Sequence, residues 1–222
     1  MIEAVVFDMD GLLIDSEFIT YQSYKDICLK YGKKFDMTYY ATFLGRNATY
    51  IESSLTKYLG CSNKAVAVMK EVHHLVEISF EHCVPLKTGV KELLEFLKSY
   101  GIKMAVATSS SRSRAVSILG KCGILDFFEV IVCGDEVKES KPDPEIFLKT
   151  IHALGGNPSN TFVIEDSESG IVAAHLGGMK CINVPDLKLP SDIIIEKADY
   201  IAEDLNEVMA YICKHPLFPV GS

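Results

Sequence analysis

The sequence lacks the cysteine spacing that marks a zinc site or a disulfide scaffold. Its seven cysteines are an odd number, and none of them forms a CxxC pair. Paired thiols of that kind are expected in zinc-binding motifs and in small secreted domains. Scattered cysteines are instead typical of reduced, buried thiols in a cytosolic protein. We therefore expect a cytoplasmic protein whose stability comes from its hydrophobic core.

Clusters of Lys and Arg, a basic leader and long apolar runs are also absent. The formal net charge is -8, and no basic patch offsets it, so neither a nucleic acid nor an anionic membrane is an expected partner. The chain opens directly on the mostly apolar residues 2–7, so no secretory signal is expected. No apolar stretch is long enough to span a bilayer.

The composition is that of a packed globular protein. Hydrophobic residues make up 48% of the chain and charged residues 23%, and this balance disfavours disorder. A length of 222 residues fits one large domain, or a core domain with a small accessory one.

Five short apolar runs recur along the sequence, and helical patterns follow them. Runs that are apolar throughout are typical of strands covered on both faces. The helical pattern is clearest over residues 90–97, where apolar side chains recur at three and four positions before Gly101. Since strand and helix alternate from about Gly89 onward, we predict a parallel α/β sheet. The predicted strands are residues 5–7, 102–107, 130–133, 162–164 and 181–184.

The stretch of residues 16–85 breaks this alternation, because it is helical without convincing strands. We interpret it as a helical cap domain inserted into a core of residues 1–15 and 86–222, with hinges near residues 14–16 and 85–87. Three apolar stripes predict the buried faces of its helices. They are Phe18, Tyr21, Tyr24, Cys28 and Tyr31, then Ile51, Leu55 and Leu59, and then Val66, Met69, His73, Val76 and Phe80.

Polar side chains gather just after four of the predicted strands. Ligands bind at the carboxyl ends of the strands in an open parallel sheet. Side chains that are far apart in sequence are therefore expected to meet in one crevice. The candidates are Asp8 and Asp10 after the first strand, Thr108 and Ser109 after the second, Lys141 after the third, and Glu165 and Asp166 after the fourth.

The acidic members of this set predict a magnesium site. Carboxylates crowded at one point repel one another and raise one another's pKa values, and a hard divalent cation relieves this repulsion. Oxygen ligands with open water positions suit Mg²⁺. We expect Asp8 and Asp166 to be direct ligands and the Asp10 carbonyl to be a third. Glu165 would bind directly or through water.

The same residues fit phosphoryl transfer. Lys141 would balance the negative charge of Asp8 and of a phosphoryl group, and Thr108 with the Ser109 amide would hold the phosphate near a helix N-terminus. A carboxylate nucleophile such as Asp8 can form an aspartyl-phosphate. Asp10 projects to the same side of an extended segment, so it can protonate the leaving oxygen and later deprotonate the attacking water.

Each motif taken alone also has an ordinary structural explanation. Asp8 and Asp10 would serve as turn formers before Gly11, and Lys141 would be a surface lysine. The run 165–167 would cap a helix well. The coincidence of four polar sites at four strand ends favours the catalytic interpretation.

Four segments resemble the motifs of the haloacid dehalogenase-like hydrolase superfamily in order and spacing. They are Asp8–Glu17, Thr108–Ser110, Ser140–Pro144 and Ile164–Ser167. The resemblance covers nearly the whole chain. It implies a Rossmann-like parallel sheet core with an inserted α-helical cap domain, as in the subgroup that contains β-phosphoglucomutase and many sugar-phosphate phosphatases. It also implies the roles given above for the nucleophile, the acid/base, the phosphate-binding residues and the metal ligands.

The resemblance favours phosphate chemistry, because dehalogenases of the family lack the second Asp, which is Asp10 here. Mutases of the subgroup usually carry a His five residues after Asp15, where this chain has Thr20. They also use an Arg shortly after a cap Gly, whereas Arg46 here directly follows Gly45. Both departures weigh against a mutase. Thr20 and Arg46 are candidates for contacting the substrate from the cap.

We predict a Mg²⁺-dependent phosphatase, a monomer or small homo-oligomer, that hydrolyses a small phosphorylated metabolite such as a sugar phosphate. Two alternatives stay open. One is a phosphosugar mutase, which would form an isomer rather than release phosphate. The other is a non-catalytic phospho-ligand sensor or partner-binding protein on the same fold, which would turn over no phosphomonoester with Mg²⁺.

Overall fold

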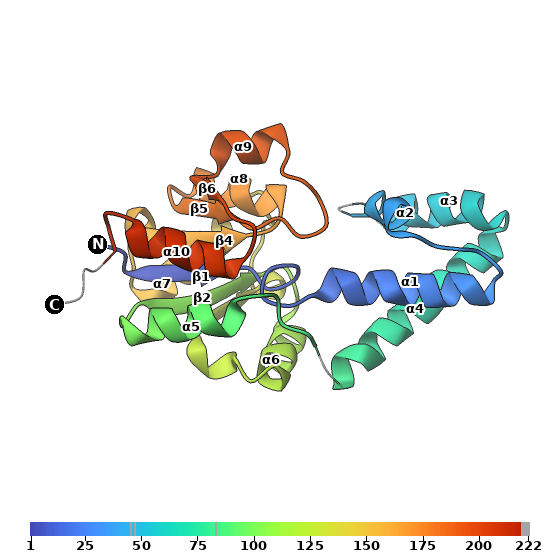
Figure 1. Ribbon diagram of the computed structural model, residues 1–222, viewed down its shortest axis with the longest axis horizontal. Helices are drawn as coiled ribbons and strands as arrows, with labels where there is room; N and C mark the ends of the chain where they lie inside the picture. Colours follow the sequence, from blue (N-terminus) through green and yellow to red (C-terminus); the bar gives the residue numbers. More distant parts are fainter. Residues whose placement is uncertain (45, 47, 83, 219–222) are drawn as a thin grey trace. The chain divides into compact units, whose positions relative to one another are not determined.

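The computed structural model describes residues 1–44, 46, 48–82 and 84–218 (Figure 1). The chain divides into two compact units. The core unit consists of Met1–Asp15 and Pro85–Ser222, and the helical unit consists of Ser16–Val84. The helical unit is therefore inserted into the chain of the core unit, shortly after the first strand.

A parallel sheet forms the centre of the core unit, with the strand order β3-β2-β1-β4-β5-β6. Every neighbouring pair of strands is parallel. Strand β1 lies between β2 and β4, and its Phe7 is in register with Val106 and Ile164. The strands are β1 Ala4–Phe7, β2 Lys103–Thr108, β3 Val130–Cys133, β4 Thr161–Glu165, β5 Lys180–Asn183 and β6 Tyr200–Ile201.

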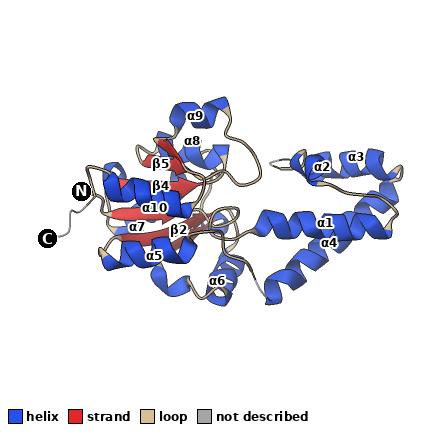
Figure 2. Cartoon of the chain, viewed as in Figure 1, coloured by secondary structure: helices blue, strands red, loops and turns tan. Residues whose placement is uncertain are grey.

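Helices connect the strands and cover the sheet, with α5 and α10 in front of the strands in Figure 2. Their ends follow capping rules: Gly155 in the left-handed conformation ends α7, and Asp204 caps α10 by accepting from two amides. None of the helices within the described ranges has the length and apolar character needed to cross a membrane. The helices of the core unit are α5 Val90–Ser99, α6 Arg112–Lys121, α7 Glu145–Leu154, α8 Glu168–Leu176, α9 Asp192–Lys197 and α10 Leu205–Lys214.

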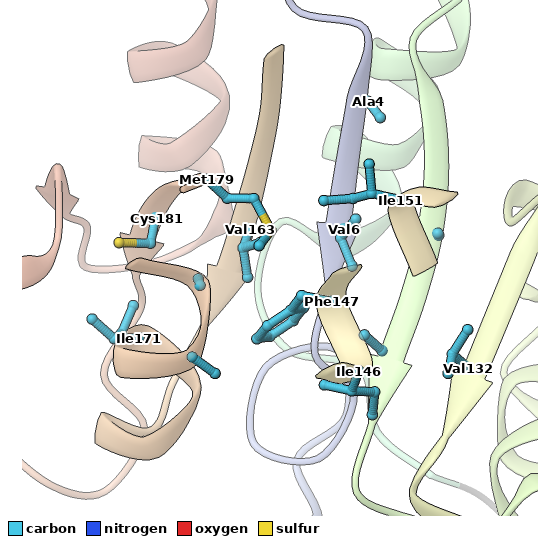
Figure 3. Packing of buried hydrophobic residues seen from close by; sticks show 14 of the residues in the cluster. Ala4, Val6, Val132, Ile146, Phe147, Ile151, Val163, Ile171, Met179 and Cys181 are labelled. Atoms are coloured by element: carbon cyan, nitrogen blue, oxygen red, sulfur yellow. The ribbon is translucent and has the colours of Figure 1, made fainter. Parts of the chain in front are cut away.

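Alternate side chains of the strands meet different helices, because successive residues of a strand point to opposite faces. Val6 and Val163 belong to a buried cluster with Phe147 of α7 (Figure 3). On the other face, the ring of Phe162 contacts Tyr211 of α10, with ring centroids 6.3 Å apart. The sheet is thus buried on both faces, and the predicted parallel α/β fold is confirmed.

The structure adds two elements that the sequence pattern did not predict, β6 and α9. Strand β6 has two residues and pairs with β5 through Tyr200 and Ile201. Helix α9 has six residues. Neither element is long enough to display a period of two or of 3.6, so periodicity could not reveal them.

The helical unit holds α1 Ser16–Lys30, α2 Met37–Ala41, α3 Ala48–Leu59 and α4 Ser62–His82. Its core is aromatic. Tyr24 of α1 stacks on Phe35, with ring centroids 5.3 Å apart, and meets Phe43 edge to face at 5.5 Å. Such ring pairs contribute roughly 0.5–1.5 kcal/mol each beyond the area that they bury.

Leu55 and Leu59 of the stripe predicted in α3 are buried, but the other two stripes predicted for this unit are partly wrong. Phe18 is 43% exposed, and the buried face of α1 includes Tyr24, Ile27 and Cys28. In the first half of α4 the predicted stripe is displaced by one residue, a rotation of about 100° around the helix, whereas Phe80 of that stripe is buried as predicted. Val66 is 50% exposed, and the buried residues are Ala65, Val68, Val72 and Phe80. Val66 and Val68 are the same residue type, so side-chain size and hydrophobicity alone do not identify which face of α4 is buried.

The linkers on either side of the helical unit pair with each other inside the core unit. Ile14 and Leu86 form an antiparallel bridge. The Lys87 amide donates to the Leu13 carbonyl at 3.1 Å. The chain therefore leaves and re-enters the core unit at adjacent points, which fixes the backbone of Lys87 close to the loop that follows β1.

Candidate active site

The loop after β1 carries Asp8 at the carboxyl end of the central strand. The Asp8 amide donates to the Ile164 carbonyl at 3.0 Å, which extends the β1–β4 pairing by one residue. The next residues turn sharply, because the amides of Leu13 and Ile14 both donate to the Met9 carbonyl. Asp8 is only 6% exposed as a result, and its direction is set by the sheet.

Lys141 joins two strand ends through its ammonium group. Its Nζ lies 2.5 Å from Asp8 Oδ1 and 2.7 Å from Glu165 Oε1, and it also donates to the Ala107 carbonyl at 3.1 Å. The Lys141 side chain is 4% exposed. Burial acts to lower the pKa of Lys141, but the charges of Asp8 and Glu165 outweigh it and hold that pKa above its usual range. Lys141 is therefore a charged residue at the bottom of the site.

The carboxylates around Lys141 carry more negative charge than one ammonium can balance. The pKa of Asp8 is raised to about 7, chiefly by burial and in part by the charge of Glu165, against the lowering effect of Lys141. Burial also holds the pKa of Asp166 well above its usual range, and the charges of Glu165 and Asp8 act in the same direction. The site thus favours either bound protons or an added cation.

The end of β4 is held by hydrogen bonds that leave little freedom to Glu165. Its Oε2 accepts from the Ser167 amide at 2.7 Å and from the Ser167 hydroxyl at 2.9 Å. The Asn183 side chain donates to the main-chain carbonyls of Glu165 and Asp166. A Cβ on Gly170 would overlap the Glu165 carboxylate, so only glycine fits at that position of α8.

The residues present fit a divalent cation. One carboxylate oxygen from each of Asp8, Glu165 and Asp166 lies within 4.8 Å of the others. Gly11 has a φ of 86°, and a Cβ there would lie 2.5 Å from Asp166 Oδ2, so the glycine leaves room for that carboxylate. Closely spaced oxygen ligands suit Mg²⁺. Glu165 has less capacity left than the two aspartates, because its oxygens already accept three hydrogen bonds.

The Asp10 side chain turns to the loop after β2. Its Oδ2 accepts from the Ser110 hydroxyl at 2.7 Å, and its Oδ1 lies 2.9 Å from Arg114 Nη2. Asp10 is therefore not among the three clustered carboxylates that could share a cation. A metal contact from this residue would come from its main-chain carbonyl, as the sequence predicts.

Thr108 and Ser109 lie in the loop between β2 and α6. The buried Thr108 hydroxyl accepts from the Ser110 amide at 3.1 Å, whereas Ser109 is exposed. The Gly134 amide donates to the Ser110 carbonyl, and a Cβ on Gly134 would overlap the Ser109 carbonyl. The first amide of α6, on Arg112, is bonded to Asp135. The start of the helix is thus already engaged within the protein, and phosphate binding by Thr108 and the Ser109 amide stays a prediction.

A second acidic group in the core unit has a structural explanation. Cys133, Asp135 and Glu136 also place ligand atoms within 4.8 Å of one another. Arg112 engages both carboxylates, with its amide on Asp135 and its guanidinium on Glu136 at 2.8 Å. Both carboxylates therefore already accept hydrogen bonds from Arg112.

Thr20 and Arg46, the candidate substrate contacts, lie in the helical unit. The Thr20 hydroxyl donates to the Ser16 carbonyl of its own helix at 2.9 Å. The Arg46 guanidinium lies over the Tyr50 ring, 5.0 Å from its centroid. Gly45, which precedes Arg46, is outside the described residues. Contact of either side chain with a substrate remains a prediction.

Over residues 5–184, the sequence matches the haloacid dehalogenase-like hydrolase family. The chain belongs to this family. The resemblance that the four motifs carry is thereby confirmed, and so is the α/β architecture that it implies.

Named relatives of this hydrolase act on phosphorylated compounds. A phosphorylated carbohydrates phosphatase of Thermotoga maritima is 36% identical over 180 residues, which cover 81% of this chain and 83% of the relative. A solved Thermotoga maritima structure assigned to the β-phosphoglucomutases is 32% identical, with a TM-score of 0.81, and covers 95% of this chain and 98% of that chain. The β-phosphoglucomutase of Clostridium difficile is 27% identical, with a TM-score of 0.67 and 96% coverage of both chains.

Sequence reasoning missed several residues around the site of this hydrolase. Ser110 belongs to a motif but has no predicted role, and Arg114 lies one helical turn after it. Asp186 follows the fifth predicted strand, so the rule that polar residues at strand ends meet at one edge points to it. Asn183 lies within that predicted strand, and the rule does not single it out. Gly170 gave no signal, because the sequence does not show which atoms a Cβ would meet.

Proposed function

We propose that this hydrolase is a Mg²⁺-dependent phosphatase that hydrolyses a phosphorylated carbohydrate through an aspartyl-phosphate on Asp8. The observation that carries the proposal is the buried contact of Asp8 with Lys141, beside Glu165 and Asp166 at the end of the central strands. A phosphorylated carbohydrates phosphatase at 36% identity supports the substrate class. The six described cysteines with free thiols support a cytoplasmic location.

In the first step, a carboxylate oxygen of Asp8 attacks the phosphorus of the substrate. The bond from phosphorus to the leaving oxygen breaks, and its electron pair stays on that oxygen. Asp10, in its protonated form, donates a proton there, so the dephosphorylated alcohol leaves. Asp8 then carries the phosphoryl group as an acyl phosphate.

In the second step, a water molecule attacks the phosphorus of the aspartyl-phosphate. Asp10 takes the proton of that water, the bond between phosphorus and the Asp8 oxygen breaks, and inorganic phosphate leaves. The Asp8 carboxylate and the protonated Asp10 are restored. One side chain thus serves as acid and then as base, which requires Asp10 to reach both the leaving oxygen and the water.

Fixed positive charge is the third part of the proposal. Lys141 faces the Asp8 oxygen at 2.5 Å, which supports a role in which its ammonium would neutralise charge on a phosphoryl oxygen. Thr108 and Ser109 would donate to the remaining oxygens from the loop after β2. Magnesium, held by Asp8, Asp166, the Asp10 carbonyl and Glu165, would supply further positive charge to the phosphoryl group.

The test is phosphate release from a panel of phosphorylated sugars, with Mg²⁺ and with EDTA. Asp8→Asn is expected to abolish turnover, since the amide is no nucleophile, while the protein stays folded. Asp126→Asn, the same chemical change at an exposed position of the core unit, is the control and should keep full activity. Near-normal turnover in Asp8→Asn would overturn the mechanism, and equal rates in EDTA would overturn the metal requirement.

A phosphosugar mutase is the second candidate, because two similar solved structures are assigned to β-phosphoglucomutases. The same panel separates the two functions when isomers are analysed together with free phosphate. Isomer formation without stoichiometric phosphate release would favour the mutase. Binding of phosphosugars without any turnover would instead favour a phospho-ligand sensor.

A further inference from the structure

Asp186, in the loop after β5, is a buried acidic residue that the proposed chemistry does not use. Its side chain is 5% exposed. One carboxylate oxygen, Oδ1, accepts from Lys87 Nζ at 2.6 Å. The other oxygen, Oδ2, is fully buried and has no hydrogen-bond partner among the described residues. A buried polar atom without a partner is costly, so such atoms usually face a water molecule, an ion or a ligand.

The unpaired oxygen is directed at the turn that carries Gly11. The position of a Cβ on Gly11 would lie 3.4 Å from Asp186 Oδ2 and 2.5 Å from Asp166 Oδ2. The carboxylates of Asp186 and Asp166 thus border the same small space beside this glycine. Asp166 is one of the three residues whose oxygens cluster closely enough to share a cation.

Asp186 itself is not a member of that cluster, which consists of Asp8, Glu165 and Asp166. We therefore do not expect Asp186 to coordinate a cation directly together with those three residues. Mg²⁺ gives up its water molecules reluctantly and usually keeps several of them in protein sites. A buried acceptor one layer outside the ligands suits such a water molecule.

Lys87 determines which way the Asp186 carboxylate faces. The Lys87 backbone is held by its hydrogen bond to Leu13, and its Nζ lies 3.9 Å from Asp15 Oδ1 as well as 2.6 Å from Asp186 Oδ1. The ion pair occupies one oxygen and leaves the other toward Gly11.

We propose that Asp186 is an outer positioning residue of the cation site, whose Oδ2 accepts a hydrogen bond from a water molecule bound to Mg²⁺. Lys87 orients this carboxylate from the linker that returns from the helical unit. The inference rests on the proposed Mg²⁺ requirement and adds residues that no motif of the chain contains. Outer residues of this kind typically change metal affinity by roughly 10- to 100-fold when they are replaced.

The test measures Mg²⁺ binding to the full chain by isothermal titration calorimetry, without substrate. Asp186→Asn is expected to weaken Mg²⁺ binding by roughly 10- to 100-fold. Lys87 selects the amide oxygen of the new side chain, so the amide NH₂ group, which cannot accept a hydrogen bond, faces the cation site. The matched control is Asp199→Asn. Asp199 pairs with Lys180 at 3.6 Å, at the opposite end of β5, and its replacement changes the net charge equally.

A second variant covers the case in which Asp186→Asn fails to fold. Lys87→Met combined with Asp186→Leu removes both buried charges together, which is often tolerated where the loss of one partner is not. It should weaken Mg²⁺ binding to the same degree. Wild-type affinity in either folded variant, or an equal loss in Asp199→Asn, would overturn the role of Asp186. A wild-type protein that does not bind Mg²⁺ would overturn both this role and the proposed metal requirement.

Discussion

Arg114 Nη2 lies 2.9 Å from Asp10 Oδ1, although the two residues are 104 positions apart in the sequence. Ser110 completes the arrangement, since its hydroxyl donates to Asp10 Oδ2 at 2.7 Å and accepts from Arg114 Nε at 3.2 Å. Both oxygens of the proposed acid/base are thus held in a fixed direction. The ion pair is partly exposed, and such pairs contribute only about 0–1 kcal/mol to stability. We therefore expect its main effect to be on the orientation of Asp10.

Replacing Arg114 should therefore impair catalysis more than stability. We expect Arg114→Met to lower kcat by about 10- to 100-fold with little change in KM, because a misplaced acid/base reacts slowly with a substrate that still binds. Steady-state kinetics on the best sugar phosphate would measure both constants. Arg112→Met is the control, since Arg112 begins the same helix but binds Glu136 instead. A rise in KM at constant kcat would mean that Arg114 binds the substrate and does not position Asp10.

Gly170 should resist a substitution that usually stabilises helices. Alanine in a helix interior is favoured over glycine by roughly 0.5–1 kcal/mol. In α8, however, the new methyl group would overlap the Glu165 carboxylate that holds Lys141. We expect Gly170→Ala to lower the free energy of unfolding by about 1–3 kcal/mol and to reduce activity.

Urea unfolding compares this variant with a matched one in α6. A Cβ on Gly120 would meet only Leu125 within 4 Å, at 3.9 Å. Gly120→Ala should therefore show the ordinary stabilisation of about 0.5–1 kcal/mol. If Gly170→Ala proved as stable as Gly120→Ala, Glu165 would have room to move, and its fixed position could not be essential to the site.

The part of the site predictable from sequence is the part that strand order determines. Asp8, Glu165 and Asp166 follow apolar runs, and parallel strands place such residues at one edge. Predicting Lys141 as a site residue requires the further assumption that the loop after β3 returns to the centre of the sheet. The contact of Lys141 with Asp8 shows that the loop does so. The family resemblance gave the same set from motif order. The catalytic roles of these residues stay predictions.

The remaining features depend on atomic contacts that no sequence pattern records. The pairing of Asp10 with Arg114 joins the loop after β1 to the first turn of α6, and helical periodicity cannot reveal such a contact. The need for glycine at position 170 arises from the volume of one carboxylate. In the helical unit, the burial of Ala65 in place of Val66 reflects how α4 packs, which large apolar side chains alone predicted wrongly.

Asp8 and Asp166 should make the stability of the metal-free protein fall as the pH rises. Burial raises the pKa of Asp8 from 3.8 to about 7 in the folded protein, and the pKa of Asp166 is raised as well. The folded state therefore binds protons that the unfolded state has already released above about pH 4. The free energy of unfolding in EDTA should decrease between about pH 4 and pH 7.

Mg²⁺ should reverse this trend, because metal binding requires the deprotonated carboxylates and stabilises only the folded state. Urea unfolding at pH 5 and pH 8, with EDTA and with Mg²⁺, measures both effects.

Burial lowers the pKa of His215, which adds stability as the pH rises and opposes the trend. The informative quantity is therefore the free energy of unfolding of the wild type minus that of Asp8→Asn, in which the contribution of His215 cancels. In EDTA this quantity should fall between pH 5 and pH 8, whereas the same subtraction with Asp126→Asn in place of Asp8→Asn should give a value that does not change with pH. A difference in EDTA that is independent of pH, or stabilisation by Mg²⁺ that is equal at pH 5 and pH 8, would show that Asp8 holds no proton that the cation must displace.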